Sequence, residues 1–462
     1  MVKRDFARKL VGKPRLLQDW DTDVEELSSK YWELFLDLLL VAGTSAVANI
    51  FMNDLTWKGF GSFLLLYLVL VNGYMLYSPD FTTRFEDTSL LHAALLFPYL
   101  MGIATCAVNA GTSPNELRFF CIGALVQRCV LLILHGNVAA TIPRAKVYCQ
   151  YTGALIFLST VCFLVAIVFP SYALRLLSLV AAFEFNTLWI KRNILPKGSV
   201  TPVNIEHMKD RQGCFILVVL GETVVSSIIT FKSAQGTGVE GRYYLTSALS
   251  FLMIFSFTLL YFHLQPAPQD NAMRKSRSRG ILLYQCTILL GASLLCAGVG
   301  VKLIVDAVLK GQMLTEDEST VMSLSVGFSM AFLLSIRLSH YGGLETDRNE
   351  PTQITHLKNL WWGSLASSVS IPFLLSFVHI EDPLTLILLY SLLISLYCVV
   401  ESTFTHILSD FLNAERRDEL AELGGGKESN RYGATDGVPS TIGSVTSATE
   451  SIESDLLTEQ TN

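Results

Sequence analysis

The stretch ILLYQCTILLGASLLCAGVGV at residues 281–301 decides the fold class, because it contains no charged side chain. A helix needs about 20 apolar residues to cross the ~30 Å hydrocarbon core of a lipid bilayer. The stretch therefore predicts one membrane-spanning helix. Applied outward along the chain, the same length rule predicts twelve spans, at residues 34–52, 60–77, 90–110, 117–137, 152–169, 172–190, 213–231, 244–263, 281–301, 321–341, 360–377 and 384–408.

The composition of the whole chain agrees with this prediction. Hydrophobic residues make up 51% of the 462 residues, and charged residues only 16%. Soluble domains carry about 25% charged residues, so this composition argues against a cytosolic enzyme, a disordered protein and a nucleic-acid binder. We expect an all-α, polytopic membrane helix bundle whose partner is the lipid bilayer. Six helices followed by six of the same orientation would allow two parallel repeats.

Three regions follow from the distribution of residue types. Residues 1–30 form a basic cytoplasmic arm, residues 31–410 hold the predicted bundle, and residues 411–462 are rich in Ser, Thr, Gly and Glu. The net charge of −6 belongs to the last region, because the chain from Asp410 onward carries 11 acids and 4 bases. Such a segment buries too little apolar surface to fold alone, so we expect a disordered acidic tail.

Lys and Arg residues in the loops predict the orientation, because cytoplasmic loops of membrane proteins are enriched in them. With a cytoplasmic N-terminus, the inner loops hold 14 of these residues and the outer loops hold 6. The N-terminal arm adds further basic residues on the inner side. We therefore expect both termini to be cytoplasmic.

Charged residues inside the predicted spans are the main functional signal. A charge at mid-bilayer costs roughly 2.5–3.5 kcal/mol on insertion scales, so such residues are expected to pair, lose their charge or line water. At ~1.5 Å per residue, Arg128 and Glu222 lie at nearly the same depth and Glu184 lies near mid-depth. The sequence therefore predicts that Arg128 bonds either Glu222 or Glu184.

Acids outnumber bases among these residues, which suggests that at least one acid is protonated at neutral pH. A buried acid that exchanges its proton is what a proton-coupled transporter requires. The predicted site consists of ion- or proton-binding acids and charge-balancing bases. The acids are Asp37, Glu222, Glu184 and Glu401, and the bases are Arg128 and Arg337. The alternative is a structural network of salt bridges that orders the helices.

The sequence lacks the motifs of common enzymes and metal sites. We find no HExxH, no GxSxG, no P-loop and no GxGxxG that opens a helix. The nine Cys form no CxxC pair and lie mostly in apolar runs, as small buried hydrophobic residues do. We expect no enzymatic activity, no metal and no cofactor.

Three segments carry a family resemblance: YWELFLDLLLVAG at 31–43, TTRFEDTSLLH at 82–92 and IEHMKDRQGCFILVVLGETVV at 205–225. They resemble the E-L-F-x-D-L motif, the Arg-Phe-acid segment and the second hallmark of the low-temperature-requirement A (LtrA-like) family. That hallmark has a His, an acid–Arg pair and a final L-G-E-[ST]. The resemblance implies a multi-pass membrane protein with motif positions at Glu33, Asp37, Arg84, His207, Arg211 and Glu222. Asp210 and Gln212 depart from the usual pattern of the second hallmark.

These observations favour a transport protein that moves an unidentified small solute or ion, coupled to protons, through a polar core. In this hypothesis Glu222 and Asp37 bind the proton or cation, and Arg128 balances the midplane charge. His207 and Arg211, with the motif residues Glu33 and Arg84, gate the cytoplasmic mouth. Three alternatives remain open: a cation channel of the same architecture, a membrane-embedded lipid-modifying enzyme, and a non-transporting stress-related scaffold or sensor.

Overall fold

The computed structural model describes residues 14–17, 31–86, 89–196, 198–232, 240–262, 265, 271–341 and 352–428. The chain divides into two units, Met1–Thr405 and His406–Asn462. In chain order the elements are β1 (Arg15–Leu16), α2 (Tyr31–Asn53), α3 (Trp57–Met75), η1 (Leu76–Phe81), β2 (Phe85–Glu86), α4 (Leu90–Val108), α5 (Pro114–Thr141), η2 (Pro143–Ala145), α6 (Lys146–Val168), η3 (Pro170–Tyr172), α7 (Ala173–Phe185), α8 (Thr187–Ile194), α9 (Ile205–Lys232), α10 (Glu240–Phe262), α11 (Ala272–Lys275), α12 (Arg277–Lys310), α13 (Glu316–Tyr341), α14 (Thr352–Leu375) and α15 (Pro383–Glu428).

The predicted all-α, polytopic helix bundle is confirmed, and a helix lies at each of the twelve predicted spans. Within the described residues, nine helical segments are long and apolar enough to cross a membrane, or ten if one bent pair counts as a span. The count of twelve spans and the parallel repeat stay predictions. β1 and β2 form one short antiparallel pair, with Arg15 opposite Glu86.

The bent pair corresponds to the predicted span at 172–190. Its two parts, Pro170–Phe185 and Thr187–Ile194, meet at an angle of 56°. Between them, the side-chain amide of Asn186 donates a 2.8 Å hydrogen bond to the carbonyl of Ala182. Asn side chains that bond nearby backbone groups in this way are favoured at turns, and Asn186 stands at the bend.

Helix ends are set by capping residues in the expected positions. Ser113 and Glu116 form a reciprocal capping box at the start of α5, which satisfies amide groups that have no partner within the helix. Gly311 ends α12 with a φ of 63°, a left-handed conformation that glycine adopts without a steric penalty.

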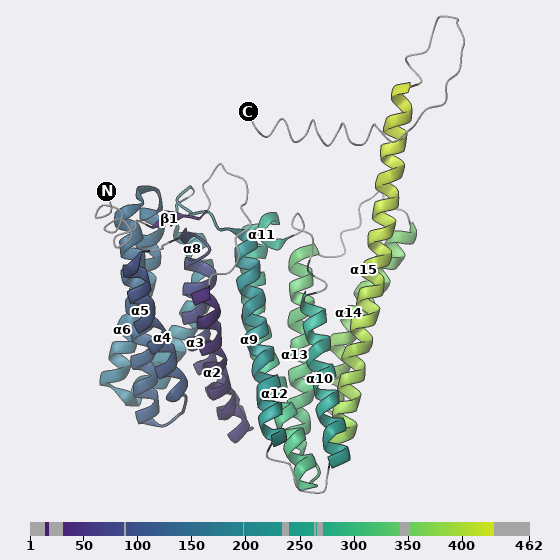
Figure 1. Ribbon diagram of the computed structural model, residues 1–462, viewed down its shortest axis with the longest axis horizontal. Helices are drawn as coiled ribbons and strands as arrows, with labels where there is room; N and C mark the ends of the chain where they lie inside the picture. The colour runs from purple at the N-terminus through teal and green to yellow at the C-terminus, as the bar shows by residue number, and fades with distance from the viewer. Residues whose placement is uncertain are drawn as a thin grey trace, which may run out of the picture. The chain divides into compact units, whose positions relative to one another are not determined.

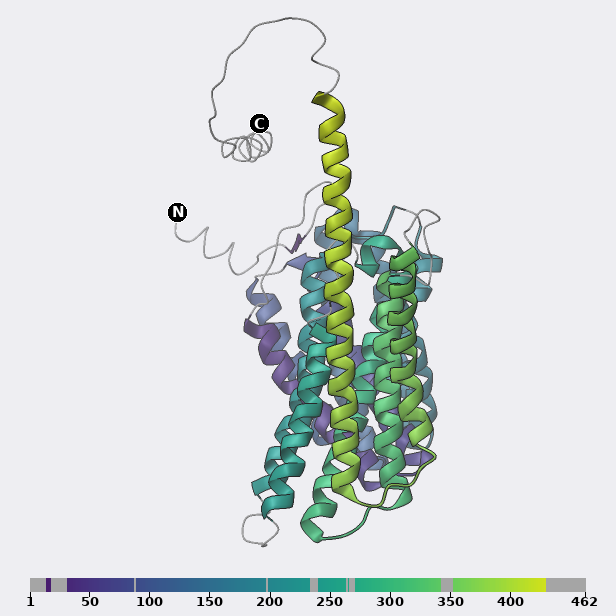
Figure 2. The same cartoon turned by 90° about the vertical axis from the view of Figure 1, so that its right-hand side faces the viewer.

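Helices α2, α3, α9 and α12 occupy the centre of the unit Met1–Thr405. α12 contacts α9, α10, α13, α2 and α3, and α2 in turn contacts α3, α4 and α9. Figures 1 and 2 show these helices side by side along a common direction, with α4, α5 and α6 beyond α2 and α3. The most apolar part of α12 is 94% buried, so α12 is enclosed by protein on almost all sides.

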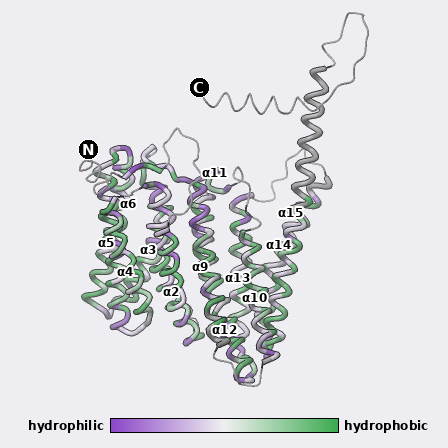
Figure 3. Tube along the Cα trace, viewed as in Figure 1, coloured by the Kyte–Doolittle hydropathy of each residue, from purple (hydrophilic) through white to green (hydrophobic). Residues whose placement is uncertain are grey.

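Apolar residues cover both the interior and the outside of this unit. Figure 3 shows hydrophobic residues along the middle of the helices and hydrophilic residues near their ends. Large apolar side chains such as Phe97, Phe157 and Phe255 are exposed. An outer surface of this kind suits contact with lipid chains.

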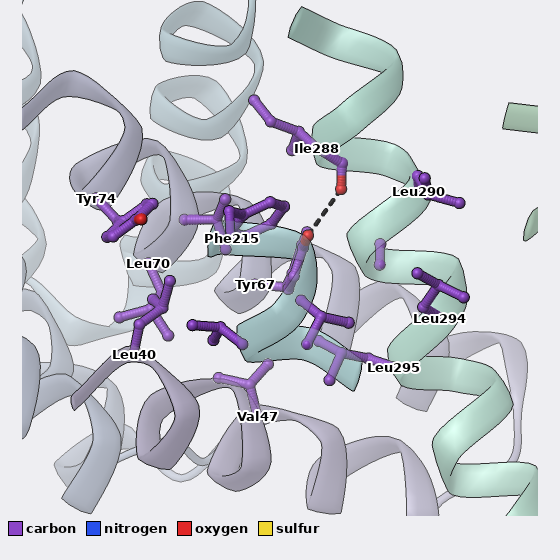
Figure 4. Close-up of a cluster of buried hydrophobic side chains, with 14 of the residues drawn as sticks. Leu40, Val47, Tyr67, Leu70, Tyr74, Phe215, Ile288, Leu290, Leu294 and Leu295 are labelled. Atoms are coloured by element: carbon purple, nitrogen blue, oxygen red, sulfur yellow. Dashed lines mark hydrogen bonds between the residues drawn. The ribbon is translucent and has the colours of Figure 1, made fainter. Parts of the chain in front are cut away.

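The central core forms where four helices meet. Leu40 and Val47 of α2, Tyr67 of α3, Phe215 of α9 and Leu294 of α12 are among the buried side chains drawn in Figure 4. The hydroxyl of Tyr67 donates a 2.7 Å hydrogen bond to the carbonyl of Ile288. This apolar layer holds in place the helices that carry the buried charges.

The predicted C-terminal tail differs from the structure at its first residues. α15 continues to Glu428, so residues 411–428 are helical where a disordered tail was expected. The segment contains FLNAERRDELAEL at 411–423, and Ala, Leu, Glu and Arg are strong helix formers. The rest of the predicted tail, 429–462, lies outside the described residues, as does the predicted arm at 1–30 except for 14–17.

Candidate functional site

Asp37 of α2 and Arg211 of α9 form a buried ion pair between the second turns of their helices. The Arg211 Nη2 to Asp37 Oδ1 distance is 2.6 Å. The Tyr74 hydroxyl donates to the same carboxylate oxygen at 2.7 Å, and the guanidinium also donates to Tyr74 and Ser78. The four side chains come from α2, α3, η1 and α9, so four helical elements hold the two charged groups in place.

One helical turn away, Glu33 faces His207 in the same helix pair. Their closest approach is 3.5 Å, between Glu33 Oε1 and His207 Nε2. Residues four apart lie on one face of a helix, so Glu33 and Asp37 of α2 meet His207 and Arg211 of α9. All four side chains are buried. We call these four residues the α2–α9 latch.

A second cluster surrounds Asp80 in η1. Its carboxylate lies 2.9 Å from Arg84 Nε and 2.8 Å from Lys191 Nζ of α8. The Tyr148 hydroxyl of α6 donates to it at 3.0 Å, and Arg84 also donates to the carbonyl of Thr201. Asp80 therefore connects the end of α3 to α6, α8 and the chain before α9.

Arg128 of α5 and Glu184 of α7 form a two-point ion pair. The Nη2 to Oε2 distance is 2.6 Å, and the Nε to Oε1 distance is 3.1 Å. Arg128 also donates to the carbonyl of Val69 at 2.9 Å and to Gln127 at 3.2 Å. The predicted bond from Arg128 to Glu222 or Glu184 is confirmed with Glu184 as the partner.

Glu222 of α9 pairs with Lys302 of α12, a partner that the sequence reasoning missed. Lys302 Nζ lies 2.9 Å from Glu222 Oε1, and both side chains are buried. The predicted span ended at residue 301, directly before this lysine, whereas α12 continues to Lys310. The position of Lys302 directly after an apolar span was the only sequence signal for this pair. It would have indicated Lys302 as a partner if the predicted helix had been extended by a few residues.

Arg337 of α13 and Glu401 of α15 form a further buried ion pair, with 2.7 Å between Arg337 Nε and Glu401 Oε1. Arg337 also donates to the carbonyl of Leu260 in α10 at 2.9 Å. This pair lies away from the α2–α9 latch in the helix order and joins three helices of the second half. It has the form expected of a structural contact.

Two predicted acids have one carboxylate oxygen with no hydrogen bond. Glu222 Oε2 and Asp37 Oδ2 are both buried and find no partner among the described residues. A buried polar atom without a hydrogen bond is costly, and a proton or a cation can satisfy it. Asp37 and Glu222 thus each have one buried carboxylate oxygen that makes no hydrogen bond within the described residues.

The geometry brings two of the motif segments against each other, since the α2–α9 latch joins residues of 31–43 to residues of 205–225. A family model described as "Bacterial low temperature requirement A protein (LtrA)" matches residues 29–401. The chain belongs to this family. The match extends from α2 to Glu401 of α15, and the apolar helices within it make the chain an integral, multi-pass membrane protein. Comparisons with the curated proteins and with the solved structures found no match.

Eight of the ten predicted site residues of this low-temperature-requirement A protein lie in buried ion pairs, and the other two, Glu33 and His207, face each other. The ten residues do not form one cluster. The expected surplus of acids is wrong, because Asp37 and Glu222 have the basic partners Arg211 and Lys302. Asp80 and Lys191 are additional members that the sequence reasoning did not select. In the described part of the chain, no three His, Cys, Asp or Glu side chains are placed to hold a metal ion.

Proposed function

We propose that this member of the family is a transporter of a small solute or ion, coupled to the movement of protons or another cation. The observation that carries the proposal is the buried Glu222–Lys302 pair, whose Glu222 Oε2 lacks a hydrogen bond. Ionisable residues inside a membrane are costly, and they commonly mark proton or ion pathways.

Glu222 is better suited than Asp37 to exchange a proton. The carboxylate of Glu222 accepts from Lys302 at Oε1, whereas Asp37 Oδ1 accepts from both Arg211 and Tyr74. The partner of Asp37 is Arg211, which stays charged under all ordinary conditions. We therefore assign the exchange of the coupled proton or cation to Glu222, and we assign the gate at the cytoplasmic mouth to the Asp37–Arg211 pair.

The α2–α9 latch supports a gating role at the cytoplasmic mouth. A proton or cation that reaches Asp37 Oδ2 would weaken the attraction between Asp37 and Arg211. His207 and Glu33 lie one turn away in the same helix pair, so they would respond to the same helix movement. In this proposal, the paired arrangement of the four latch residues described above is the closed state of the gate.

Purified protein in liposomes tests the proposal in an ion-resolved flux screen, with and without a pH gradient. We expect flux through the wild type and its loss in Glu222→Gln. The double variant Glu222→Gln/Lys302→Met removes both charges, so it should fold but carry no coupled flux. The control is Asp306→Asn, which breaks an exposed pair with Lys310 on the same helix. Coupled flux that persists in the double variant would contradict the assignment of Glu222.

A channel and a scaffold are the competing functions that this experiment separates. Unitary currents in electrical recordings would favour an uncoupled cation channel, and slow, saturable flux favours a carrier. The one-to-one pairing of Arg128 with Glu184 and of Arg337 with Glu401 favours a scaffold. In that case, neutral replacement of both members of each pair would leave the biological role intact.

A further inference from the structure

A cleft of about 570 Å³ lies apart from all of the ion pairs, between α2 and α3 on one side and α12 and α13 on the other. Its walls are mainly apolar, with Phe51, Phe60, Cys296, Leu324 and Phe328 among the lining residues. The volume falls within the ~300–1,000 Å³ range of pockets that bind small molecules. All four helices contain segments that are long and apolar enough to cross a membrane.

The length of the cleft matches the depth of one membrane leaflet. Along α13 its lining runs from Asp317 to Phe332, which at 1.5 Å per residue is about 22 Å. Half of a bilayer, headgroups included, is about 20–22 Å thick. One acyl chain that stands along the membrane normal, with its headgroup at one end, would therefore match the cleft in length.

The two ends of the cleft differ in chemistry. Thr56, Trp57, Asp317 and Thr320 line the end where α3 and α13 begin, whereas Phe332 lies at the other end. Trp57 is 81% exposed, and tryptophan rings are typical of the membrane interface. Asp317 lies in an acidic first turn with Glu316 and Glu318. This end therefore offers negative charge at headgroup depth.

We propose that the cleft binds one phospholipid whose headgroup carries a primary ammonium group. The acyl chain lies against the phenylalanine side chains, and the ammonium group lies at Asp317. Apolar walls select hydrocarbon over water, and the carboxylate favours a headgroup with an ammonium group over a headgroup whose only charge is its phosphate. This inference does not depend on the proposed transport function.

The test uses the full-length protein in vesicles that contain phosphatidylethanolamine with a photoreactive group in its acyl chain. We expect crosslinks within the lining segments of α12 and α13. Leu324→Trp places a larger side chain in the cleft and should lower labelling about tenfold, because each buried CH₂ group contributes to lipid binding. The control Leu338→Trp lies on the same helix, is 39% exposed and does not line the cleft. Equal labelling of these two variants would overturn the proposed chain site.

A comparison of two lipids that differ in their headgroups tests the proposed ammonium site at Asp317. Wild-type protein should prefer phosphatidylethanolamine over phosphatidylglycerol, and Asp317→Asn should lose that preference while it still takes up the acyl chain. Size-exclusion profiles check that each variant is folded. Equal labelling of the wild type by both lipids, or by a free fatty acid, would overturn the ammonium site.

Discussion

Arg128 is fully buried, and each of its three guanidinium nitrogens donates a hydrogen bond. Glu184 binds two of its nitrogens, the carbonyl of Val69 accepts from one of them, and the ring of Phe163 lies 5.3 Å from the guanidinium carbon. A planar guanidinium with several fixed donors is suited to such a two-point contact. This residue orders α3, α5, α6 and α7 around a single charge.

Glu184→Gln should destabilise the protein, because it leaves Arg128 with a neutral partner. We expect a loss of up to about 2.5–3.5 kcal/mol, the insertion cost of a charge at the centre of a membrane helix. Thermal unfolding in detergent measures it. The double variant Glu184→Gln/Arg128→Met should recover part of the loss. If the double variant is less stable than Glu184→Gln alone, the charge pairing does not explain the stability.

Gly73 provides the space that Arg128 needs. A Cβ atom at this position would overlap Gln127 Oε1 and Arg128 Nη1. Gly73→Ala should therefore displace the guanidinium and cost roughly 1–3 kcal/mol, the usual range for overpacking. Gly136→Ala is the matched control, because a Cβ at that helical glycine meets nothing within 4 Å. Similar unfolding temperatures for the two variants would contradict this account.

At the scale of helices, the sequence predicted where helices occur better than it predicted which helices contact each other. Length and apolarity were sufficient to place a helix at each predicted span. The depth estimate brought Arg128 to the level of Glu184, and their pairing is confirmed. Depth does not fix the rotation of a helix, however, so Glu222 was left with the wrong set of possible partners.

Lys302 and Asp80 were missed because they lie just outside two predicted spans. The span 281–301 ended directly before Lys302, and the span 60–77 ended three residues before Asp80. The helices continue beyond those ends, since a charge that meets an opposite charge inside the bundle can be accommodated. The α2–α9 latch was also missed as a contact, although its four residues had been selected. Only the fold brings residues of 31–43 against residues of 205–225.

The latch predicts energetic coupling between Asp37 and Arg211. A double-mutant cycle with Asp37→Asn and Arg211→Met should give an interaction free energy of roughly 0.5–3 kcal/mol. The reference cycle combines Asp37→Asn with Arg337→Met, two positions for which no shared contact is found in the described residues. We expect additive effects in the reference cycle, measured by chemical unfolding in detergent. Additivity in both cycles would show that the α2–α9 pair contributes no specific interaction.

At the scale of the whole molecule, the basic loops predict which end of the bundle faces the cytoplasm. In a variant without its native cysteines, Lys310→Cys at the end of α12 should react with an impermeant maleimide applied from outside cells. Arg192→Cys near the end of α8 should react only after the membrane is opened, because basic residues are enriched on the cytoplasmic side. The reverse labelling pattern would invert the predicted orientation of both termini.

Two buried clusters depend on the π-helical turn η1, so a change in the number of residues in this short segment would break one of them. Within it, Ser78 accepts from Arg211 and Asp80 accepts from Arg84 and Lys191, so two side chains that are two residues apart serve different clusters. Removing one residue from this turn would rotate the helical side chains that follow the deletion by about 100° about the helix axis, and it would separate one cluster from its partners. Related chains should therefore tolerate insertions and deletions in the connections between helices, and they should keep the spacing from Tyr74 to Arg84 unchanged.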